Sequence, residues 1–274
     1  LGAVSPSAPS SPIPMMVNQG VLDMQPNLLI LGGTTEATVF AKAAAAVCHN
    51  GIVSFAGRVN RIKRQPLPQR VGGFGGVSGL VHFMQTTNVT HVIDATHPFA
   101  AQMSRNAVIA CAQAHVPLMA LTRPPWVART GDNWTHVPDI QGAVGALDRA
   151  ACRVMLAVGR IQLQNFVPNH QHFYLLRLVD PPVIAPPFPR CHVVVSRGPF
   201  TAENDLNLMQ KHRINLLVSK NAGGSGAYAK ITAARRLDLP VIMIERPPIL
   251  KRMETNSVTD VLAWINHIGA ERGV

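Results

Sequence analysis

The sequence predicts an α/β fold that consists of two open parallel-sheet domains in tandem. Short apolar runs alternate with helix-length amphipathic or Ala-rich segments from Asn27 onward, which is the pattern of a parallel sheet whose strands are connected by helices. These apolar runs are too numerous for one compact sheet of this type. A strand–helix–strand unit also occurs twice along the chain, which indicates two similar domains.

Each strand is expected where a short aliphatic or β-branched run stands between turn residues. The expected strands cover residues 28–31, 52–55, 91–95, 118–121, 153–158, 173–178, 192–196, 215–219 and 241–245. The segments between them have the length and composition of helices. The expected helices cover residues 35–48, 100–114, 140–151, 201–211, 227–237 and 258–268. Thr201 with Asn204, and Ser257 with Asp260, resemble capped helix starts.

The repeated unit covers residues 92–125 and 215–248, which share one layout at an offset of 123 residues. The order in both is strand, polar turn, Ala-rich helix, strand and Arg-Pro-Pro. The matched pairs include Arg123 with Arg246 and His97 with Lys220. Chance is the alternative explanation, because all strand–helix–strand units resemble one another.

The repeat and the composition together predict the domain organisation. We expect a first domain at 27–128 and a second domain at 129–274. Residues 1–26 are rich in Pro and Ser, so we expect them to be a disordered leader or an expression remnant, with Met24 as a plausible native start.

Several classes of protein are excluded by what the sequence lacks. No run of about 18 apolar residues, the length that spans a membrane, is present. The four cysteines are far apart, which argues against a disulfide framework or a zinc ribbon and for a reducing compartment, the cytoplasm. The motifs of serine hydrolases, P-loop NTPases, zinc proteases and short-chain dehydrogenases are absent.

Ligands of open parallel sheets bind outside the carboxyl ends of the strands, so the turns that follow the strands are the candidate sites. The first such turn opens a helix and consists of Gly32, Gly33, Thr34, Thr35 and Glu36. Glycines let backbone N–H groups approach a phosphate, and a helix N-terminus favours its negative charge. A tight turn that binds no ligand would need the same glycines.

The second strand ends without a carboxylate: Ser54 and Phe55 are followed by Ala56, Gly57 and Arg58. NAD-binding folds usually place Asp or Glu near this point, where it accepts a hydrogen bond from the ribose, whereas an Arg there accommodates the 2′-phosphate of NADP. If a dinucleotide binds, we therefore expect it to be NADP(H), with Arg58 on the phosphate. A solvated surface arginine is the alternative.

Three further turns carry candidate residues. The glycine-rich run 72–76 surrounds Phe74 and indicates either a floppy surface loop or a mobile flap. His97 follows the third strand and is either a structural histidine or an acid, base or hydrogen-bond donor. Lys220 precedes a glycine pair, where it either grips an anion beside bare N–H groups or faces solvent.

Seven motifs of these turns occur together in the chain: LILGGTTEA, SFAGR, GGFGGVSGL, VIDATHPFA, LTRPPW, RGPF and SKNAGG. In this order and spacing they closely resemble the precorrin-6A reductase family of cobalamin biosynthesis, over residues 28–250. The resemblance implies two Rossmann-like domains with the active site in a cleft between them. It also implies NADPH-dependent reduction of a macrocycle double bond of precorrin-6A to give precorrin-6B. A sister enzyme for the cobalt-bearing macrocycle and a non-catalytic binding protein are the alternatives.

The resemblance further implies roles for individual residues. NADPH is expected at the first domain, on Gly32, Gly33, Thr34, Thr35, Glu36, Ser54, Ala56, Gly57, Arg58, Gly75, Gly76, Thr96, His97 and Pro98. The substrate is expected on Phe74, Arg123, Arg197, Gly198, Lys220, Asn221, Gly223 and Gly224. His97 and Lys220 are the catalytic candidates, and His97, Lys220 or water could donate the proton that accompanies hydride transfer. Ala222 replaces the usual Ser of this turn, which removes one possible hydrogen bond to a substrate carboxylate.

The charge of the chain fits such a substrate. A tetrapyrrole with many carboxylate arms needs cationic walls, and the net charge is +11. Nucleic acid is the rival polyanion, but only 5% of residues are aromatic and no nucleic-acid-binding module is present. The charge therefore favours a tetrapyrrole over nucleic acid as the partner. We further expect a monomer, with no metal site and no membrane.

Overall fold

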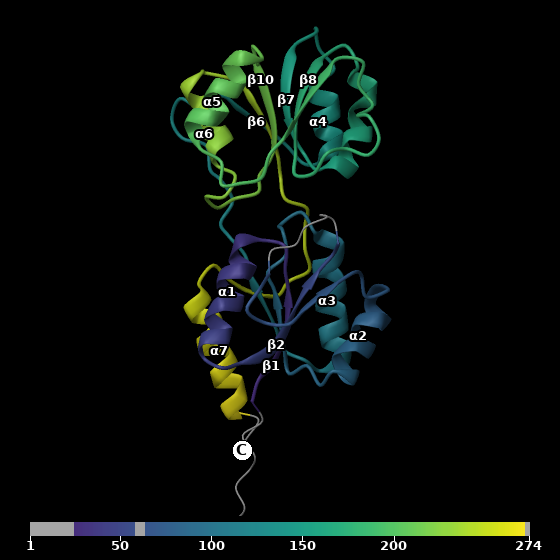
Figure 1. Ribbon diagram of the computed structural model, residues 1–274, viewed down its shortest axis with the longest axis vertical. Coiled ribbons are helices and arrows are strands. Elements are labelled where there is room, and N and C mark those ends of the chain that lie inside the picture. The colour runs from purple at the N-terminus through teal and green to yellow at the C-terminus, as the bar shows by residue number, and fades with distance from the viewer. Residues whose placement is uncertain (1–24, 58–63, 272–274) are drawn as a thin grey trace, which may run out of the picture.

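The computed structural model describes residues 25–57 and 64–271, which form two domains, each built around a six-stranded sheet (Figure 1). All strand pairs of both sheets are parallel, and helices lie on both faces of each sheet. The predicted fold class, α/β with two Rossmann-like open parallel-sheet domains in tandem, is confirmed.

The first part of the chain contains β1 (Asn27–Leu31), α1 (Thr35–Ala46), β2 (Asn50–Phe55), β3 (Gln69–Val71), α2 (Gly76–Thr86), β4 (His91–Asp94), α3 (Ala101–Ala114) and β5 (Leu118–Leu121). The middle part contains β6 (Trp134–Val137), α4 (Ile140–Ala146), β7 (Arg153–Ala157), the 3-10 helix η1 (Arg160–Asn169), β8 (Phe173–Leu178), β9 (Cys191–Val195), α5 (Ala202–Lys211), β10 (Leu216–Lys220), α6 (Ala229–Arg236) and β11 (Val241–Ile244). The last elements are β12 (Met253–Thr255) and α7 (Val258–Glu271).

The side chains of β1 show why its apolar run forms a central strand. Leu28 and Ile30 point to the face that α1 and α7 cover, and Leu29 and Leu31 point to the face that α2 and α3 cover. Both faces are buried from Leu28 to Leu31, so these four positions are all apolar. The central strands of the second sheet follow the same rule.

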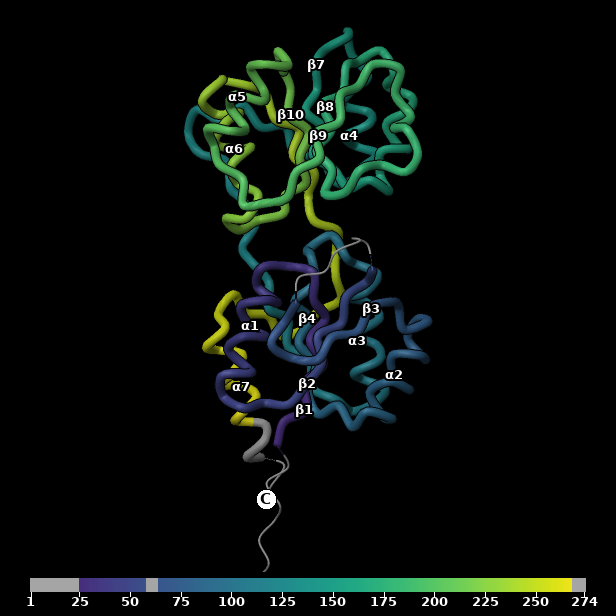
Figure 2. The backbone as a smooth tube through the Cα atoms, in the orientation of Figure 1, coloured from purple at the N-terminus to yellow at the C-terminus, as the bar shows by residue number. Residues whose placement is uncertain are grey.

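The two sheets have the same strand order, β12-β5-β4-β1-β2-β3 in the first and β6-β11-β10-β7-β8-β9 in the second. The sixth strand of each sheet is exchanged between the domains. β12 follows β11 in the chain but pairs with β5, and β6 follows β5 but pairs with β11. The chain therefore crosses between the domains twice, through a first crossing segment at 122–133 and a second at 245–252 (Figure 2).

The expected second domain, 129–274, is therefore wrong at its C-terminal end. β12 extends the first sheet, and α7 places Val261, Trp264 and Ile265 in the core beside α1. β12 pairs with the edge of β5, and α7 covers the part of the sheet face beside α1. Periodicity predicts the helix at 258–268 but carries no information on which of the two sheets it packs against.

Five elements were missed in the sequence: β3, β6, β12, α2 and η1. The edge strands β3 and β12 have three residues each and largely exposed side chains, so neither contains an apolar run. Helix α2 begins at Gly76, the last residue of the glycine-rich run, which thus forms a strand-to-helix turn. No helix in the described ranges is long and apolar enough to cross a membrane.

The strand pairs of the repeat are not in one register. The paired residues are Val92 with Leu118 in β4 and β5, and Leu217 with Val241 in β10 and β11. The outer strands are thus related by 241 − 118 = 123 residues, but the inner strands by 217 − 92 = 125. The predicted equivalence of His97 with Lys220, which used one offset for both strands, is therefore wrong.

Candidate active site

The carboxyl ends of the two sheets meet where the crossing segments lie (Figure 1). The Lys220 ammonium, at the end of β10, is 4.8 Å from the centre of the Phe99 ring in the turn after β4. Arg123, in the first crossing segment, forms an ion pair of 2.8 Å with Glu36 and donates a hydrogen bond of 2.8 Å to the carbonyl of Ala222. The predicted strand-end turns of both domains therefore come together.

The glycine turn after β1 is shaped by its neighbours. Gly32 donates from its N–H to the Ser54 carbonyl at 2.8 Å, and a Cβ there would lie 3.1 Å from Val53. Gly33 has a φ of +120°, and a Cβ there would meet no atom within 4 Å, so this side of the turn is open. Thr34 caps α1 by accepting from the N–H of Ala37 at 3.1 Å. The turn thus presents glycine backbone and a helix start to an open space.

Glu36 does not act on its own at this helix start, because its carboxylate is held by Arg123. Glu36, predicted to bind the cofactor, and Arg123, predicted to bind the substrate, therefore form an ion pair with each other. Each neutralises the other at the junction between the domains, with side chains only 25% and 14% exposed.

At the end of β2 the structure places an arginine that the sequence reasoning missed. Arg70 of β3 donates from one terminal nitrogen to the Ser54 hydroxyl at 2.8 Å and to the Gly72 carbonyl at 3.0 Å. Its other terminal nitrogen donates to the Gly73 carbonyl at 3.0 Å, and its guanidinium lies 3.9 Å from the centre of the Phe74 ring. Phe74, predicted on a flap or floppy loop, is thus packed beneath Arg70.

Three other predicted cofactor residues flank this place. Gly57 follows β2 with a φ of +74°, and Gly75 and Gly76 begin α2 with φ values of +80° and +92°. These angles favour glycine, which explains the composition of both turns without a ligand. Arg58, the predicted phosphate contact, lies outside the described residues.

A buried carboxylate supports the turn after β4. Asp94, which is 2% exposed, accepts from the N–H of Thr96 at 3.1 Å and from its hydroxyl at 2.7 Å. Its second oxygen accepts from Arg252, at the end of the second crossing segment. The predicted residue Thr96 thus fixes the turn that carries His97.

His97 itself is neutral. Its Nδ1 accepts from the N–H of Phe99 at 3.2 Å, which leaves the ring proton on Nε2. Burial, followed by the positive charges around it, lowers the pKa of His97 to about 3. Those charges belong to Arg123, Lys220, Arg246 and Lys230. At neutral pH His97 can donate a hydrogen bond from Nε2 but is not a general acid.

The turn after β10 is held by the first crossing segment. Asn221, 2% exposed, accepts from the N–H of Trp126 at 2.7 Å and donates to its carbonyl at 3.0 Å. The Trp126 indole N–H donates to the Gly224 carbonyl at 2.7 Å. Asn221, predicted to bind substrate, therefore has its side chain committed to the backbone of the crossing segment.

The second crossing segment holds the same turn from the other side. Arg246 donates to the Asn221 carbonyl at 3.0 Å, to the Ala222 carbonyl at 3.2 Å and to the Arg123 carbonyl at 2.8 Å. A Cβ at Gly223 would lie 2.2 Å from both Arg246 and the Pro124 carbonyl oxygen, so only glycine fits. We call the turn 220–224 with these contacts the interdomain clamp.

Other predicted substrate residues lie on the second domain. Arg197, before Gly198, pairs with Asp180 at 2.5 Å on the surface. The missed residue Lys230 is 8% exposed, donates to the Ala227 carbonyl at 2.8 Å and lies 4.7 Å from the centre of the Trp126 ring. Burial lowers the pKa of Lys230 to about 7. Nothing in the sequence of α6 indicated that Lys230 is buried or that it lies beside Trp126.

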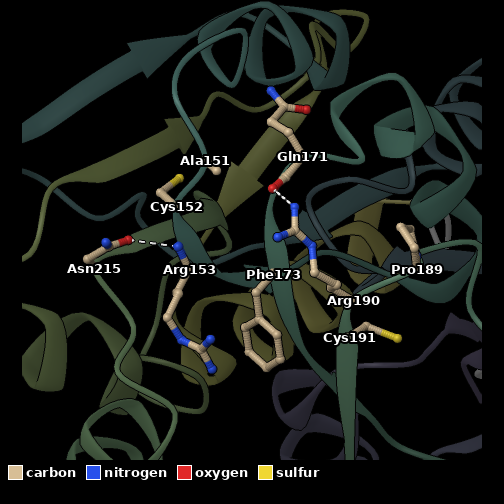
Figure 3. Close-up of a pocket in the computed structure, with 9 residues that line it drawn as sticks. All are labelled: Ala151, Cys152, Arg153, Gln171, Phe173, Pro189, Arg190, Cys191 and Asn215. Carbon is tan, nitrogen blue, oxygen red and sulfur yellow. Dashed lines mark hydrogen bonds between the residues drawn. The ribbon is translucent and has the colours of Figure 1, made fainter.

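Cavities lie at both the carboxyl ends and the amino ends of the strands. One of about 210 Å³ lies at the carboxyl ends of β4 and β5 and is lined by His97 and Thr96, and by Arg246 and Ile249 of the second crossing segment. A larger one of about 410 Å³ lies at the amino ends of β7 and β8 (Figure 3). No predicted site residue lines the larger cavity. The smaller one is the candidate active-site cavity, because parallel sheets bind ligands at their carboxyl ends. In the described parts of the chain, no three His, Cys, Asp or Glu side chains are placed to hold a metal ion.

Comparisons with known proteins agree with the family suggested by the turns. The sequence model of precorrin-6x reductase CbiJ/CobK matches residues 27–266. A protein of Rhodobacter capsulatus named precorrin-6A reductase is 52% identical over 248 residues, which cover 90% of this chain and 99% of that protein. A solved structure titled CobK precorrin-6A reductase is 52% identical, has a TM-score of 0.87 and is covered completely by 91% of this chain. A cobalt-precorrin-6A reductase of Priestia megaterium is 29% identical over 241 residues, 81% of this chain and 91% of that protein. The chain therefore belongs to the precorrin-6x reductase family.

Proposed function

We propose that this protein reduces a macrocycle double bond of precorrin-6A to give precorrin-6B in cobalamin biosynthesis, with NADPH as the hydride donor. One observation carries the proposal. The glycine turn of one parallel-sheet domain and the basic turn of the other are joined by Arg123, which pairs with Glu36 and donates to the Ala222 carbonyl, and a cavity of about 210 Å³ lined by His97 and the second crossing segment lies at the carboxyl ends of β4 and β5. A dinucleotide on the first domain would thereby face a substrate on the second.

The residues present fit a nicotinamide dinucleotide. A helix start behind Gly32 and Gly33 suits a pyrophosphate, and the open side of Gly33 leaves room for it. When bound, NADPH supplies the hydride. The residues of the chain position and polarise the cofactor and the substrate. Thr96 and His97 line the cavity at the carboxyl ends of β4 and β5.

Lys220 is the proton donor in this proposal. Of the two catalytic candidates, His97 is not an imidazolium at neutral pH, because burial, followed by the positive charges around it, lowers its pKa to about 3. Lys220 lies at the same junction, on the side of the second domain. The Nε2–H of His97 is instead available to donate a hydrogen bond to a bound ligand.

The electrostatics fit a polycarboxylate substrate. Arg123, Lys220 and Arg246, together with a partly protonated Lys230, place positive charge around His97, and Glu36 pairs with Arg123, so the junction has a net positive field. We expect carboxylate arms to be attracted to it. All four cysteines are free, which accords with a reducing cytoplasm as the compartment.

Turnover with purified substrates tests the proposal. Precorrin-6A should be converted to precorrin-6B with consumption of one NADPH, faster than the cobalt-bearing macrocycle, since the relative with 52% identity is named for the metal-free substrate. Binding of both compounds without oxidation of NADPH would show a carrier. Faster turnover of the cobalt form would show the sister activity.

A further inference from the structure

We propose that Arg70 recognises the 2′-phosphate of the dinucleotide and makes the protein select NADPH over NADH. This inference rests on the proposed function, because it requires a dinucleotide on the first domain. It names the residue that determines cofactor specificity, at a place where the sequence alone indicated Arg58.

The position of Arg70 is the first argument. Leu31 on β1 is paired with Ser54 on β2, and Ser54 is paired with Arg70 on β3, so one strand, β2, separates Arg70 from the strand that leads into the glycine turn. The Gly32 N–H bonds the Ser54 carbonyl, and the Ser54 hydroxyl accepts from Arg70. In folds of this type the group at the end of β2 meets the adenosine ribose. Arg70 is the guanidinium that the described structure places there.

The hydrogen bonds of Arg70 are the second argument. Its bonds to Ser54, Gly72 and Gly73 use three of the five N–H groups of a guanidinium. All three acceptors are uncharged, and no carboxylate of the described residues forms an ion pair with it. Arg70 therefore keeps its full positive charge for an external anion.

The preorganisation of Arg70 is the third argument. The ring of Phe74 lies against one face of the guanidinium, and two carbonyls fix its edge, so its plane is set before a ligand arrives. A planar fork held in one orientation suits a phosphate better than a mobile lysine does. The glycine-rich run thus has a function that neither of its sequence interpretations included: it holds an arginine.

Binding of adenosine fragments tests the role without catalysis. We would measure the Kd of 2′,5′-ADP and of ordinary 5′-ADP by calorimetry for the wild type, Arg70→Gln, Arg70→Lys and the matched control Arg149→Gln, whose side chain is exposed on the second domain and donates to the Ala146 carbonyl. Arg70→Gln should weaken 2′,5′-ADP about tenfold or more and leave 5′-ADP nearly unchanged, the scale of one charge-assisted contact. Arg70→Lys should lose part of this preference, and the control none.

The outcomes separate this inference from the proposed function. Equal weakening of both fragments by Arg70→Gln and Arg70→Lys would mean that Arg70 only braces the loop, which overturns the inference. Unchanged discrimination between NADPH and NADH in both variants would overturn it as well, and loss of discrimination in Arg58→Ala would then assign the phosphate to Arg58. Failure of the wild type to bind any of the nucleotides would instead refute the proposed function.

Discussion

His97 should make the folded protein less stable as the pH falls, and His97→Gln should remove much of that dependence. In the folded state burial and four cations lower the pKa of His97 to about 3. In the unfolded chain an imidazole titrates near its ordinary value of about 6.5. Between these values the unfolded chain binds one proton more than the folded chain, so the free energy of unfolding rises with pH in this window.

The magnitude follows from the width of the window. Each pH unit that separates the two titrations changes the free energy of unfolding by about 1.4 kcal/mol for one proton. From pH 6.5 to pH 5.0 the cost assigned to His97 is therefore about 2 kcal/mol. The contribution is absent above pH 6.5, where both states are neutral, and it is complete near pH 3.

Urea unfolding between pH 5.0 and 7.5 checks this, together with an NMR titration of the imidazole signals. His82→Gln, at an exposed position of α2, provides the matched control for the substitution itself. The stability of His97→Gln should change less between pH 6.5 and 5.0 than that of the wild type, by about 2 kcal/mol. An imidazole of His97 that titrates near pH 6.5 would refute the argument and restore His97 as a proton donor.

Three further changes test other parts of the structure. Lys220→Ala should raise the KM for precorrin-6A about tenfold or more and lower kcat, with NADPH affinity unchanged, because a contact of about 1.5 to 3 kcal/mol is lost. Unchanged kinetics would show that Lys220 is a solvent-facing surface lysine. Gly223→Ala should destabilise the protein by more than about 1 kcal/mol, since its φ is +69° and the new Cβ would lie 2.2 Å from the Pro124 carbonyl oxygen. A wild-type Tm for this variant would contradict the interdomain clamp. Trp264→Ala should lower the stability of the first domain by about 3 kcal/mol or more, because the indole is 9% exposed and lies in the core of that domain. A loss of stability confined to the second domain would contradict the strand exchange.

The central strands could be predicted from the sequence, and the edge strands could not. β1 and β10 are buried on both faces, so their apolar runs indicate that they lie in the centre of a sheet. β3 and β12 have one neighbour each and carry polar or exposed side chains. Their strand conformation comes from hydrogen bonds to a partner that is distant in sequence, which no local pattern contains.

The candidate turns were predictable for a related reason. A parallel sheet places the ends of all its strands at one edge, so residues after β1, β4 and β10 had to gather at such edges. What each side chain does there was not predictable. Asn221, expected on the substrate, bonds Trp126, and Arg70 lies beside Ser54 only because β3 pairs with β2.

The strand exchange explains how groups on different domains can act on one substrate. β6 and β12 each pair with the sheet of the other domain, so the spacing between domains is set by two covalent crossings. Those crossings carry Arg123 and Arg246, which both bond the carbonyl of Ala222 in the interdomain clamp. Lys220 is the first residue of this clamp, and Arg246 also lines the cavity that His97 lines. Because one arginine joins both places, the position of Lys220 relative to His97 depends on the exchanged strands, and a chain with the same turns but unexchanged strands would not hold it.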